Sequence, residues 1–570
     1  PPLLTIDALS LSIRGKPILR DVSLSIGPGE ILALTGESGS GKSMTAFATI
    51  GLTPDGTETT GRILLGETDI LQLSENRLCD IRGRAIGMIF QEPMTALNPV
   101  QTIGRQVAET IEIHARTGAP GATPPVRAEE RAAEVLARVG LPPDRVPPDR
   151  YPHELSGGQR QRVVIAMAIA LRPALLIADE PTTALDVTTQ AQILDLLKAL
   201  VREEGMGLMM ITHDLAVVSD MADRIAVMNK GEIVETGPTR TLFAHRKHPY
   251  TRALFDASRH RADLPAVTPG SPLLTLENVS RDYLLPRTRL FAPRASFRAV
   301  ADVSFTIHAG ERVGLVGESG CGKSTLTRAI LGLEPVQAGT ITLGGAPVWT
   351  DGHPNLAVRR RMQVVFQDPY ASFNPRHRVD RLISEPFHLL ETKPTPPERA
   401  ARIAEALTAV GLKPEDAGKY IHAFSGGQRQ RIAIARALII EPDLILFDEA
   451  VSALDVRVRA QILDLMAALS RSRGLTYLFI SHDLSVVRSI TDRVLVMRAG
   501  TIVESGDTET VFTNPQHPYT RALIAAAPTL PPETTAPATP DPQNGSDASD
   551  GQRRADSPHA DPSGPAPSSP

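Results

Sequence analysis

The sequence predicts an α/β protein that contains two copies of one domain. Three observations predict this fold: several stretches occur twice, short apolar runs alternate with helical patterns, and each copy carries a glycine-rich phosphate-binding pattern. The repeated stretches are GESGSGKS and GESGCGKS at 36 and 317, LSGGQRQR and FSGGQRQR at 155 and 424, and HPYTRAL at 248 and 517. Equivalent residues lie 281 positions apart in the first pair and 269 apart in the other two. Chain length therefore varies between the first and second stretches, as surface insertions allow.

The repeat divides the chain into four segments. We expect a first domain over 1–258, a linker over 259–272, a second domain over 273–530 and a tail over 531–570. The tail contains no Ile, Leu, Val, Met or aromatic residue, so it cannot bury a core and is predicted to be disordered. A Gly- and Pro-rich stretch at 117–130 is predicted to be one of these surface insertions.

The composition of the chain excludes several classes of protein and of site. The chain has 570 residues, 42% of them hydrophobic and 22% charged, with a net charge of −4, which gives no indication of nucleic-acid binding. Its two cysteines, Cys79 and Cys321, cannot form a disulfide framework or a four-cysteine metal site, and they favour a reducing compartment. We see no signal peptide and no apolar run of about 18 to 20 residues, so a membrane part would come from other chains.

The elements of the first copy follow in order. Apolar runs in EILALTG (30–36), LLIADE (175–180) and GLMMITHD (207–214) predict buried strands. TQAQILDLLKALVREE (189–204) has the spacing of a helix between two of these strands. Alternation of this kind predicts a largely parallel sheet covered by helices.

Two stretches fit the phosphate-binding loop G-x-x-x-x-G-K-[ST], and each follows an apolar run and opens a helix. Glycines let backbone N–H groups surround a phosphate, the lysine reaches its oxygens, and the serine hydroxyl binds Mg²⁺. We therefore expect ATP to contact Gly36, Glu37, Ser38, Gly39, Ser40, Gly41, Lys42 and Ser43 at one site, and Gly317, Glu318, Ser319, Gly320, Cys321, Gly322, Lys323 and Ser324 at the other.

Polar side chains at the ends of apolar runs complete each predicted site. The first acid of each Asp-Glu pair suits Mg²⁺, and the second suits positioning the attacking water. A carboxamide can reach the metal or the water, and a strand-end histidine in a phosphate-loop domain favours a γ-phosphate contact. The expected Mg²⁺ ligands are Ser43, Asp179 and Gln91, and in the second copy Ser324, Asp448 and Gln367; the expected catalytic residues are Glu180, His213 and Gln91, and Glu449, His482 and Gln367.

In this order the motifs resemble the ATP-binding cassette family over nearly all of residues 3–530. The resemblance implies two cassettes, each with a helical subdomain, that enclose two ATP molecules, so that the signature turn of one cassette closes on the phosphate loop of the other. It places Ser425, Gly427 and Gln428 against ATP on Lys42. It places Ser156, Gly158 and Gln159 against ATP on Lys323. It also implies that an aromatic residue stacks on adenine, for which Tyr283 is the candidate in the second copy, whereas Ile13 aligns with it in the first.

FQEPMTALNP, FQDPYASFNP and the doubled HPYTRAL resemble the ATPases of dipeptide, oligopeptide and nickel importers. That resemblance implies two membrane permease subunits, a solute-binding protein outside the membrane, and a peripheral place on the cytoplasmic face of the inner membrane. Relatives with an iron–sulfur cluster carry a cysteine-rich stretch after HPYTRAL; this chain has none, so we expect ATP and Mg²⁺ but no cluster.

Alternatives of other classes stay open at this point. A soluble translation or repair ATPase with two cassettes would usually have a long charged linker or cysteine-rich insertions, and neither is present. An exporter ATPase would not be expected to carry HPYTRAL. Among solutes, peptides, glutathione, nickel and opine-like compounds all remain compatible with the sequence.

Overall fold

The computed structural model describes residues 1–116, 127–183, 185–284, 294–368 and 371–531. All but one residue of the tail predicted at 531–570, and most of the insertion predicted at 117–130, lie outside these ranges.

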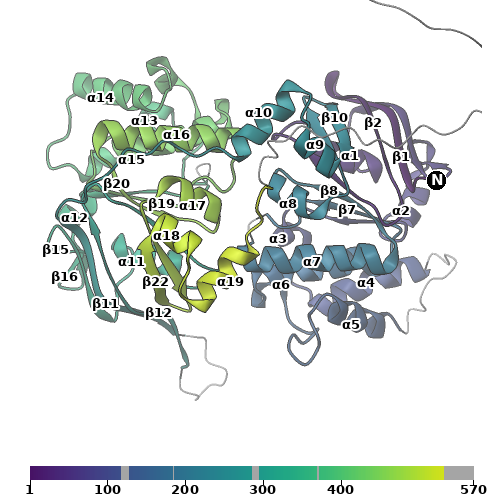
Figure 1. Ribbon diagram of the computed structural model, residues 1–570, viewed down its shortest axis with the longest axis horizontal. Helices are drawn as coiled ribbons and strands as arrows, with labels where there is room; N and C mark the ends of the chain where they lie inside the picture. The colour runs from purple at the N-terminus through teal and green to yellow at the C-terminus, as the bar shows by residue number, and fades with distance from the viewer. Residues whose placement is uncertain (117–126, 184, 285–293, 369–370, 532–570) are drawn as a thin grey trace, which may run out of the picture. The chain divides into compact units, whose positions relative to one another are not determined.

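Each half of the chain holds an antiparallel four-stranded sheet and a mixed six-stranded sheet (Figure 1). The first half has β1 (Leu4–Ile13), β2 (Lys16–Ile26), β3 (Ile31–Thr35), β4 (Thr57–Leu65), β5 (Thr68–Asp69), β6 (Ile86–Ile89), β7 (Leu175–Asp179), β8 (Gly207–Ile211), β9 (Arg224–Asn229) and β10 (Glu232–Pro238). The second half has β11 (Pro272–Leu284), β12 (Ser296–His308), β13 (Arg312–Val316), β14 (Ala338–Leu343), β15 (Ala346–Pro347), β18 (Met362–Val365), β19 (Leu444–Asp448), β20 (Thr476–Ile480), β21 (Arg493–Arg498) and β22 (Thr501–Asp507), besides the short pair β16 (Trp349–Thr350) and β17 (His353–Pro354).

The two halves have the same sheet topology. The four-stranded sheets run β2-β1-β4-β5 and β12-β11-β14-β15. The six-stranded sheets run β10-β9-β3-β8-β7-β6 and β22-β21-β13-β20-β19-β18, and every neighbouring pair is parallel except β9–β10 and β21–β22. The prediction of two copies with largely parallel sheets is therefore confirmed.

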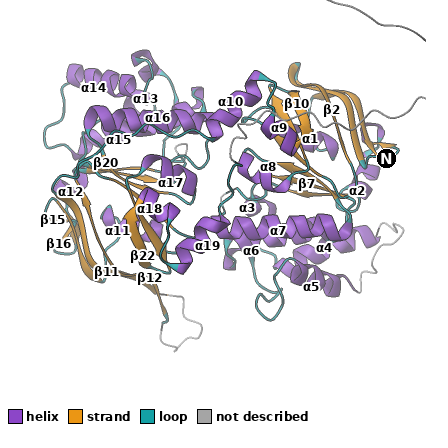
Figure 2. Cartoon of the chain, viewed as in Figure 1, coloured by secondary structure: helices purple, strands orange, loops and turns teal. Residues whose placement is uncertain are grey.

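Helices flank the sheets in both halves (Figure 2). The first half has α1 (Lys42–Thr49), α2 (Glu75–Ile81), α3 (Pro93–Ala96), α4 (Ile103–Arg116), α5 (Ala128–Arg138), α6 (Gly157–Ile169), α7 (Val187–Glu204), α8 (Leu215–Met221), α9 (Thr239–Ala244) and α10 (Pro249–Ser258). The second half has α11 (Lys323–Ile330), α12 (Leu356–Arg360), α13 (Val379–Ile383), α14 (Pro396–Ala409), α15 (Gly426–Leu438), α16 (Val456–Arg473), α17 (Leu484–Ile490), α18 (Thr508–Thr513) and α19 (Pro518–Ala526). No helix among these is both long and apolar enough to cross a membrane.

The predicted strands and helix of the first half are found where the sequence places them. The apolar runs form β3, β7 and β8, and all five residues of each strand are buried. The predicted helix is α7, which begins at Val187 because the Asp186 carboxylate accepts the Thr189 N–H at 3.0 Å. It ends at Gly205, whose φ of 65° suits a glycine C-cap.

The parallel strands bring the predicted site residues to one edge of each sheet. Strands β3, β7 and β8 are parallel neighbours, so their carboxyl ends meet. The phosphate loop follows β3, Glu180 follows β7, and His213 follows β8 after one residue. The same holds for β13, β19 and β20 in the second half.

Candidate active site

The first phosphate loop connects β3 to α1, and its shape requires glycine at two positions. Gly36 has φ 152°, and a Cβ there would lie 2.1 Å from the Met228 carbonyl oxygen. Gly41, the N-cap of α1, has φ 107°. In the second loop, Gly317 and Gly322 have φ 154° and 111°. At these glycines both loops therefore approach the neighbouring backbone so closely that a residue with a Cβ would not fit.

The loop lysines fold back onto their own loops. Lys42 Nζ donates to the carbonyl oxygens of Gly36 and Glu37, each at 2.8 Å. Lys323 makes the matching bonds to Gly317 and Glu318, at 2.7 and 2.8 Å. Burial lowers the pKa of Lys42, although nearby carboxylates, Glu180 first among them, oppose that effect. An ammonium has three donors, so at Lys42 one remains for a phosphate oxygen, whereas Lys323 Nζ also lies 3.7 Å from Cys321 Sγ.

An aspartate that is buried in the first half and half-buried in the second lies beside each loop. Asp179 at the end of β7 is 3% exposed and accepts a hydrogen bond from Ser43, while burial raises its pKa. Its Oδ1 is buried and has no hydrogen-bond partner among the described residues. Burial likewise raises the pKa of Asp448 in the second half. A buried acceptor of this kind fits a cation ligand, because an unsatisfied carboxylate oxygen is costly.

The two glutamates next in sequence are held by the strand-end histidines. His213 Nδ1 lies 3.1 Å from Glu180 Oε1, and His482 Nδ1 lies 3.2 Å from Glu449 Oε1. Burial alone would raise the pKa of Glu180, but the hydrogen bond from His213 and nearby positive charge lower it to about 2. The pKa of Glu449 is also lowered, with His482 opposing burial. Both glutamates are thus kept ionised, as a group that orients water requires.

The glutamines make different contacts in the two halves. Gln91 Nε2 donates to Glu180 Oε2 at 3.0 Å, and Thr183 donates to the same oxygen at 2.8 Å. Gln367 Nε2 instead donates to the Ser452 hydroxyl at 3.3 Å, and that hydroxyl bonds the Glu449 carbonyl rather than its side chain. The sequence analysis did not predict Thr183 as a site residue. Its position three residues after Glu180 is the sequence feature that could have identified it.

The signature turns are built as helix caps. Ser156 Oγ accepts the Gln159 N–H at 3.2 Å, and Gln159 Oε1 accepts the Ser156 N–H at 3.0 Å. Ser425 and Gln428 make the same pair of bonds. This reciprocal pattern is a capping box, so Ser and Gln at this spacing start α6 and α15 whether or not nucleotide is bound.

The glycines of the signature turns differ in their surroundings. A Cβ on Gly158 would lie 2.3 Å from Thr189 Cγ2, and one on Gly427 would lie 2.3 Å from Val458 Cγ1. A Cβ on Gly426 would meet no atom of the described part of the chain within 4 Å. The predicted ATP-facing residues Gly158 and Gly427 therefore also let the signature helix pack on the helix that follows the Asp-Glu turn.

The candidate adenine residue is found in the second half alone. Tyr283 on β11 donates from its hydroxyl to Glu334 Oε2 at 2.5 Å, and the Arg281 guanidinium lies 4.8 Å from its ring centre. Leu4 pairs with Leu65 as Leu274 pairs with Leu343, so the strand register places Ile13 where Tyr283 lies.

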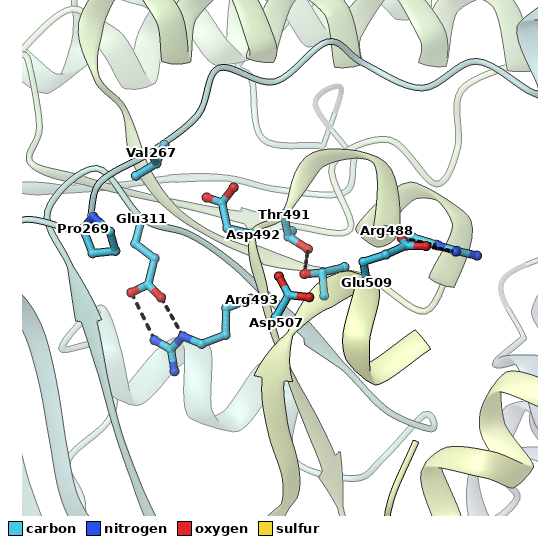
Figure 3. Close-up of a pocket in the computed structure, with 10 residues that line it drawn as sticks. Val267, Pro269, Glu311, Arg488, Thr491, Asp492, Arg493, Asp507 and Glu509 are labelled. Atoms are coloured by element: carbon cyan, nitrogen blue, oxygen red, sulfur yellow. Dashed lines mark hydrogen bonds and ion pairs between the residues drawn. The ribbon is translucent and has the colours of Figure 1, made fainter. Parts of the chain in front are cut away.

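Among the described residues of the second half, one cavity lies beside the phosphate loop and another lies away from it. One, of about 760 Å³, brings Ser324, Gln367, Asp448 and Glu449 together with residues of the helical region, such as Arg436. The other, of about 520 Å³, contains no phosphate-loop residue (Figure 3). Two of its arginines are already paired, Arg493 with Glu311 at 2.6 Å and Arg488 with Glu509 (Figure 3), and Asp492 pairs with Arg312 at 2.7 Å. The first cavity is therefore the one that suits catalysis.

Residues of the second half also reach the first phosphate loop. Arg457 Nη1 lies 2.9 Å from Glu37 Oε1. Asp455, two residues earlier, is among the carboxylates whose charge acts on Lys42. Both follow the Asp-Glu turn of the second half and begin α16. In the reverse direction, Val187 at the start of α7 belongs to the hydrophobic core of the second half.

Two phosphate loops, each with a strand-end aspartate, a histidine-held glutamate and a capped signature helix, define a class of tandem ATPase. The family model described as ABC transporter matches residues 19–183 and 300–452. The chain belongs to the ABC transporter family and is an ATPase. A second model, described as the C-terminal region of oligopeptide/dipeptide transporters, matches residues 234–265 and 503–552.

Among curated relatives, the chain is 46% identical over 553 residues to the glutathione import ATP-binding protein GsiA of Escherichia coli O157:H7, covering 91% of this chain and 88% of that protein. The GsiA protein of Shigella flexneri has the same identity and coverage. A solved structure of cbiO1 from Clostridium perfringens, part of an ABC transporter complex, is 26% identical and matches 43% of this chain and 92% of its own, with a TM-score of 0.37.

Proposed function

We propose that the chain is the ATP-hydrolysing subunit that drives import of a peptide or a related small solute through a membrane ABC transporter. Two matched catalytic centres in one chain, each followed by a segment of the oligopeptide/dipeptide transporter type, carry this proposal. The domains would span 1–258 and 273–530, joined by the linker 259–272 and followed by the tail 531–570.

Each ATP site would be shared between the two cassettes. Lys42 would hold ATP together with Ser425, Gly427 and Gln428, and Lys323 together with Ser156, Gly158 and Gln159. The contact of Arg457 with Glu37, and the nearness of Asp455 to Lys42, support this arrangement because both residues follow the second signature helix in the chain. A helix N-terminus facing the γ-phosphate would supply N–H donors and a favourable dipole.

Mg²⁺ would bind at Ser43, Asp179 and Gln91, and at Ser324, Asp448 and Gln367. The buried Oδ1 of Asp179, which has no hydrogen-bond partner among the residues that the structure describes, fits this role. When bound, Mg²⁺ neutralises charge on the β- and γ-phosphates.

The protein groups would act mainly by positioning. Glu180 and Glu449, kept ionised by His213 and His482, would orient the attacking water. Lys42 and Lys323 would hold the phosphates. Hydrolysis would then separate the cassettes and move the attached permeases.

The solute class rests on the transporter segment and on the relatives. Glutathione, the solute named for the relatives, is itself a small peptide, so peptide import and glutathione import are compatible. Two permease subunits, a solute-binding protein outside the membrane and a place on the cytoplasmic face of the inner membrane would complete the transporter.

The direct experiment measures solute uptake in cells from which the gene for this chain and the genes for any equivalent importer have been deleted. Restoring the wild-type chain should restore uptake of labelled glutathione or dipeptide, and the Glu180→Gln, Glu449→Gln chain should not. Affinity purification from detergent-solubilised membranes should recover permease subunits. Recovery of ribosomal proteins without permeases, and unchanged uptake, would contradict the proposal.

A further inference from the structure

The doubled HPYTRAL stretch forms the same local structure in both halves. Pro249 and Pro518 occupy the first helical position of α10 and α19. Each preceding histidine caps its helix: His248 Nδ1 accepts the Tyr250 N–H, and His517 Nδ1 accepts the Tyr519 N–H, both at 3.1 Å. The backbone at the tyrosine is thus fixed by its own sequence.

A glutamate on the preceding strand holds the turn before each helix. Glu235 accepts the N–H groups of Lys247 and His248, at 2.9 and 3.1 Å. Glu504 accepts those of Gln516 and His517, at 2.8 and 3.0 Å. Each HPY segment is therefore tied to the edge of its own six-stranded sheet, and its tyrosine projects from a braced position.

Both tyrosines reach the phosphate loop of their own half. The Tyr250 hydroxyl accepts the Glu37 N–H at 3.0 Å across 213 residues of sequence, and the Tyr519 hydroxyl accepts the Glu318 N–H at 3.0 Å. Tyr250 is 9% exposed and Tyr519 is 6% exposed. Two copies with different flanking residues make the same bond, which argues against a chance contact.

The bonded peptide is the one that holds the loop lysine. The peptide between Gly36 and Glu37 donates its N–H to Tyr250 and accepts Lys42 Nζ at its carbonyl oxygen. On the glycine side the loop is pressed against the Met228 carbonyl, which leaves no room for a Cβ. The tyrosine hydroxyl therefore orients the carbonyl that aims the lysine.

We propose that Tyr250 and Tyr519 are positioning residues that hold each phosphate loop in the conformation that binds ATP. This inference rests on the nucleotide sites proposed above. Two lysine donors are engaged by loop carbonyls, so the direction of the third donor depends on that peptide. If this peptide rotated, the third donor of the lysine would no longer point toward the phosphates. The segment that marks the transporter class would thus be part of the nucleotide site.

The test measures ATP affinity one loop at a time. In a full-length chain carrying Lys323→Ala and Glu180→Gln, Mg²⁺-ATP binding reports the first loop without hydrolysis. Adding Tyr250→Phe, which removes only the hydroxyl, should raise the Kd about 2- to 12-fold, the range for one hydrogen bond. Hydrogen exchange of the Glu37 amide should become faster. Tyr519→Phe should act likewise at the second loop, in a Lys42→Ala, Glu449→Gln chain.

Tyr477→Phe is the matched control. Tyr477 is fully buried and donates to the Ile490 carbonyl at 2.5 Å, so its loss should lower the melting temperature and leave the Kd for ATP unchanged. If Tyr250→Phe and Tyr519→Phe behave as Tyr477→Phe does, the tyrosines are merely structural and the inference is wrong. If Lys42→Ala instead leaves ATP binding at the first loop intact, the nucleotide-site assignment itself fails.

Discussion

At the scale of single residues, the two proposed catalytic glutamates share an unusual backbone. Glu180 and Glu449 have φ 48° and 51°, a region that L-residues other than Asn and Asp seldom adopt. Each is held there because its N–H donates to the neighbouring strand, to Ile211 and Ile480, both at 2.9 Å. Strain of this kind is typical of functional positions and costs about 1–3 kcal/mol. Ala450, which stands where the first half has Pro181, leaves this geometry unchanged.

The first prediction concerns these glutamates. Because each is ionised and bonded to a strand-end histidine, Glu180→Gln with Glu449→Gln should lower ATP turnover by about 10²- to 10⁴-fold while ATP still binds. Steady-state phosphate release and a filter assay for retained ATP would measure both effects. Turnover within a few-fold of wild type would contradict the assignment.

The second prediction concerns pH. The pKa of Glu180 is lowered to about 2 from 4.5, so ionisation stabilises the fold fully above pH 4.5, and that contribution is lost as pH falls toward 2. Its size is about 3 kcal/mol. Glu180→Gln should therefore lower the melting temperature at neutral pH, and the difference from wild type should shrink as the pH falls from 4.5 toward 2. A difference that stays the same size as the pH falls through this range would contradict the prediction.

The third prediction concerns adenine. Tyr283 offers a ring to the second site, and Ile13 offers aliphatic contact to the first, so we expect ATP to bind about 5-fold more weakly at the Lys42 site. Kd values would be measured with one loop lysine mutated at a time. Ile13→Tyr should tighten the first site and Tyr283→Ala should weaken the second; equal affinities that neither change alters would rule the asymmetry out.

At the scale of helices and strands, the signature helices depend on close packing as well as on their caps. Gly427 lies against Val458 on α16, and Gly158 lies against Thr189 on α7. A side chain at either position would push the signature helix away from the helix that follows the Asp-Glu turn. The packing of the signature helix on the helix after the Asp-Glu turn therefore couples the position of the signature turn to the position of the proposed catalytic glutamate.

The fourth prediction uses this contact. Gly427→Ala should destabilise the fold by about 1–3 kcal/mol, the usual cost of overpacking. Gly426→Ala, one residue away with open space around it, should leave the melting temperature unchanged. Thermal unfolding of both variants gives the comparison; equal melting temperatures would show that α15 adjusts without cost.

Local patterns predicted the parts of the site that are contiguous in sequence. The phosphate loops, the Asp-Glu strand ends and α7 were predicted because their signals lie within a few residues of one another. The capping box was also visible, as Ser156 with Gln159, but was interpreted only as a ligand contact. The antiparallel sheets were not predicted, since pairs such as Leu4 with Leu65 join distant strands. The bond from Tyr250 to Glu37 was missed for the same reason.

At the scale of the whole molecule, the contacts between halves involve the elements that carry the sites. Helix α10 packs against α16, and α19 packs against α7. The same helices begin at the HPY segments and at the residues after the Asp-Glu turns. Through Tyr250 and Arg457, the first phosphate loop contacts both its own transporter segment and the opposite cassette. Nucleotide bound at the first phosphate loop would therefore affect the conformation of both halves through these contacts.

The central claim is that each ATP site is shared between the cassettes, and trapping at a single loop tests it most directly. In a chain with Lys42→Ala and Glu449→Gln, only the Lys323 loop can retain labelled ATP. We predict that Ser156→Arg abolishes this retention and that Ser425→Arg, in the same cassette as Lys323, leaves it intact. Loss of retained ATP with Ser425→Arg and normal retention with Ser156→Arg would contradict the account.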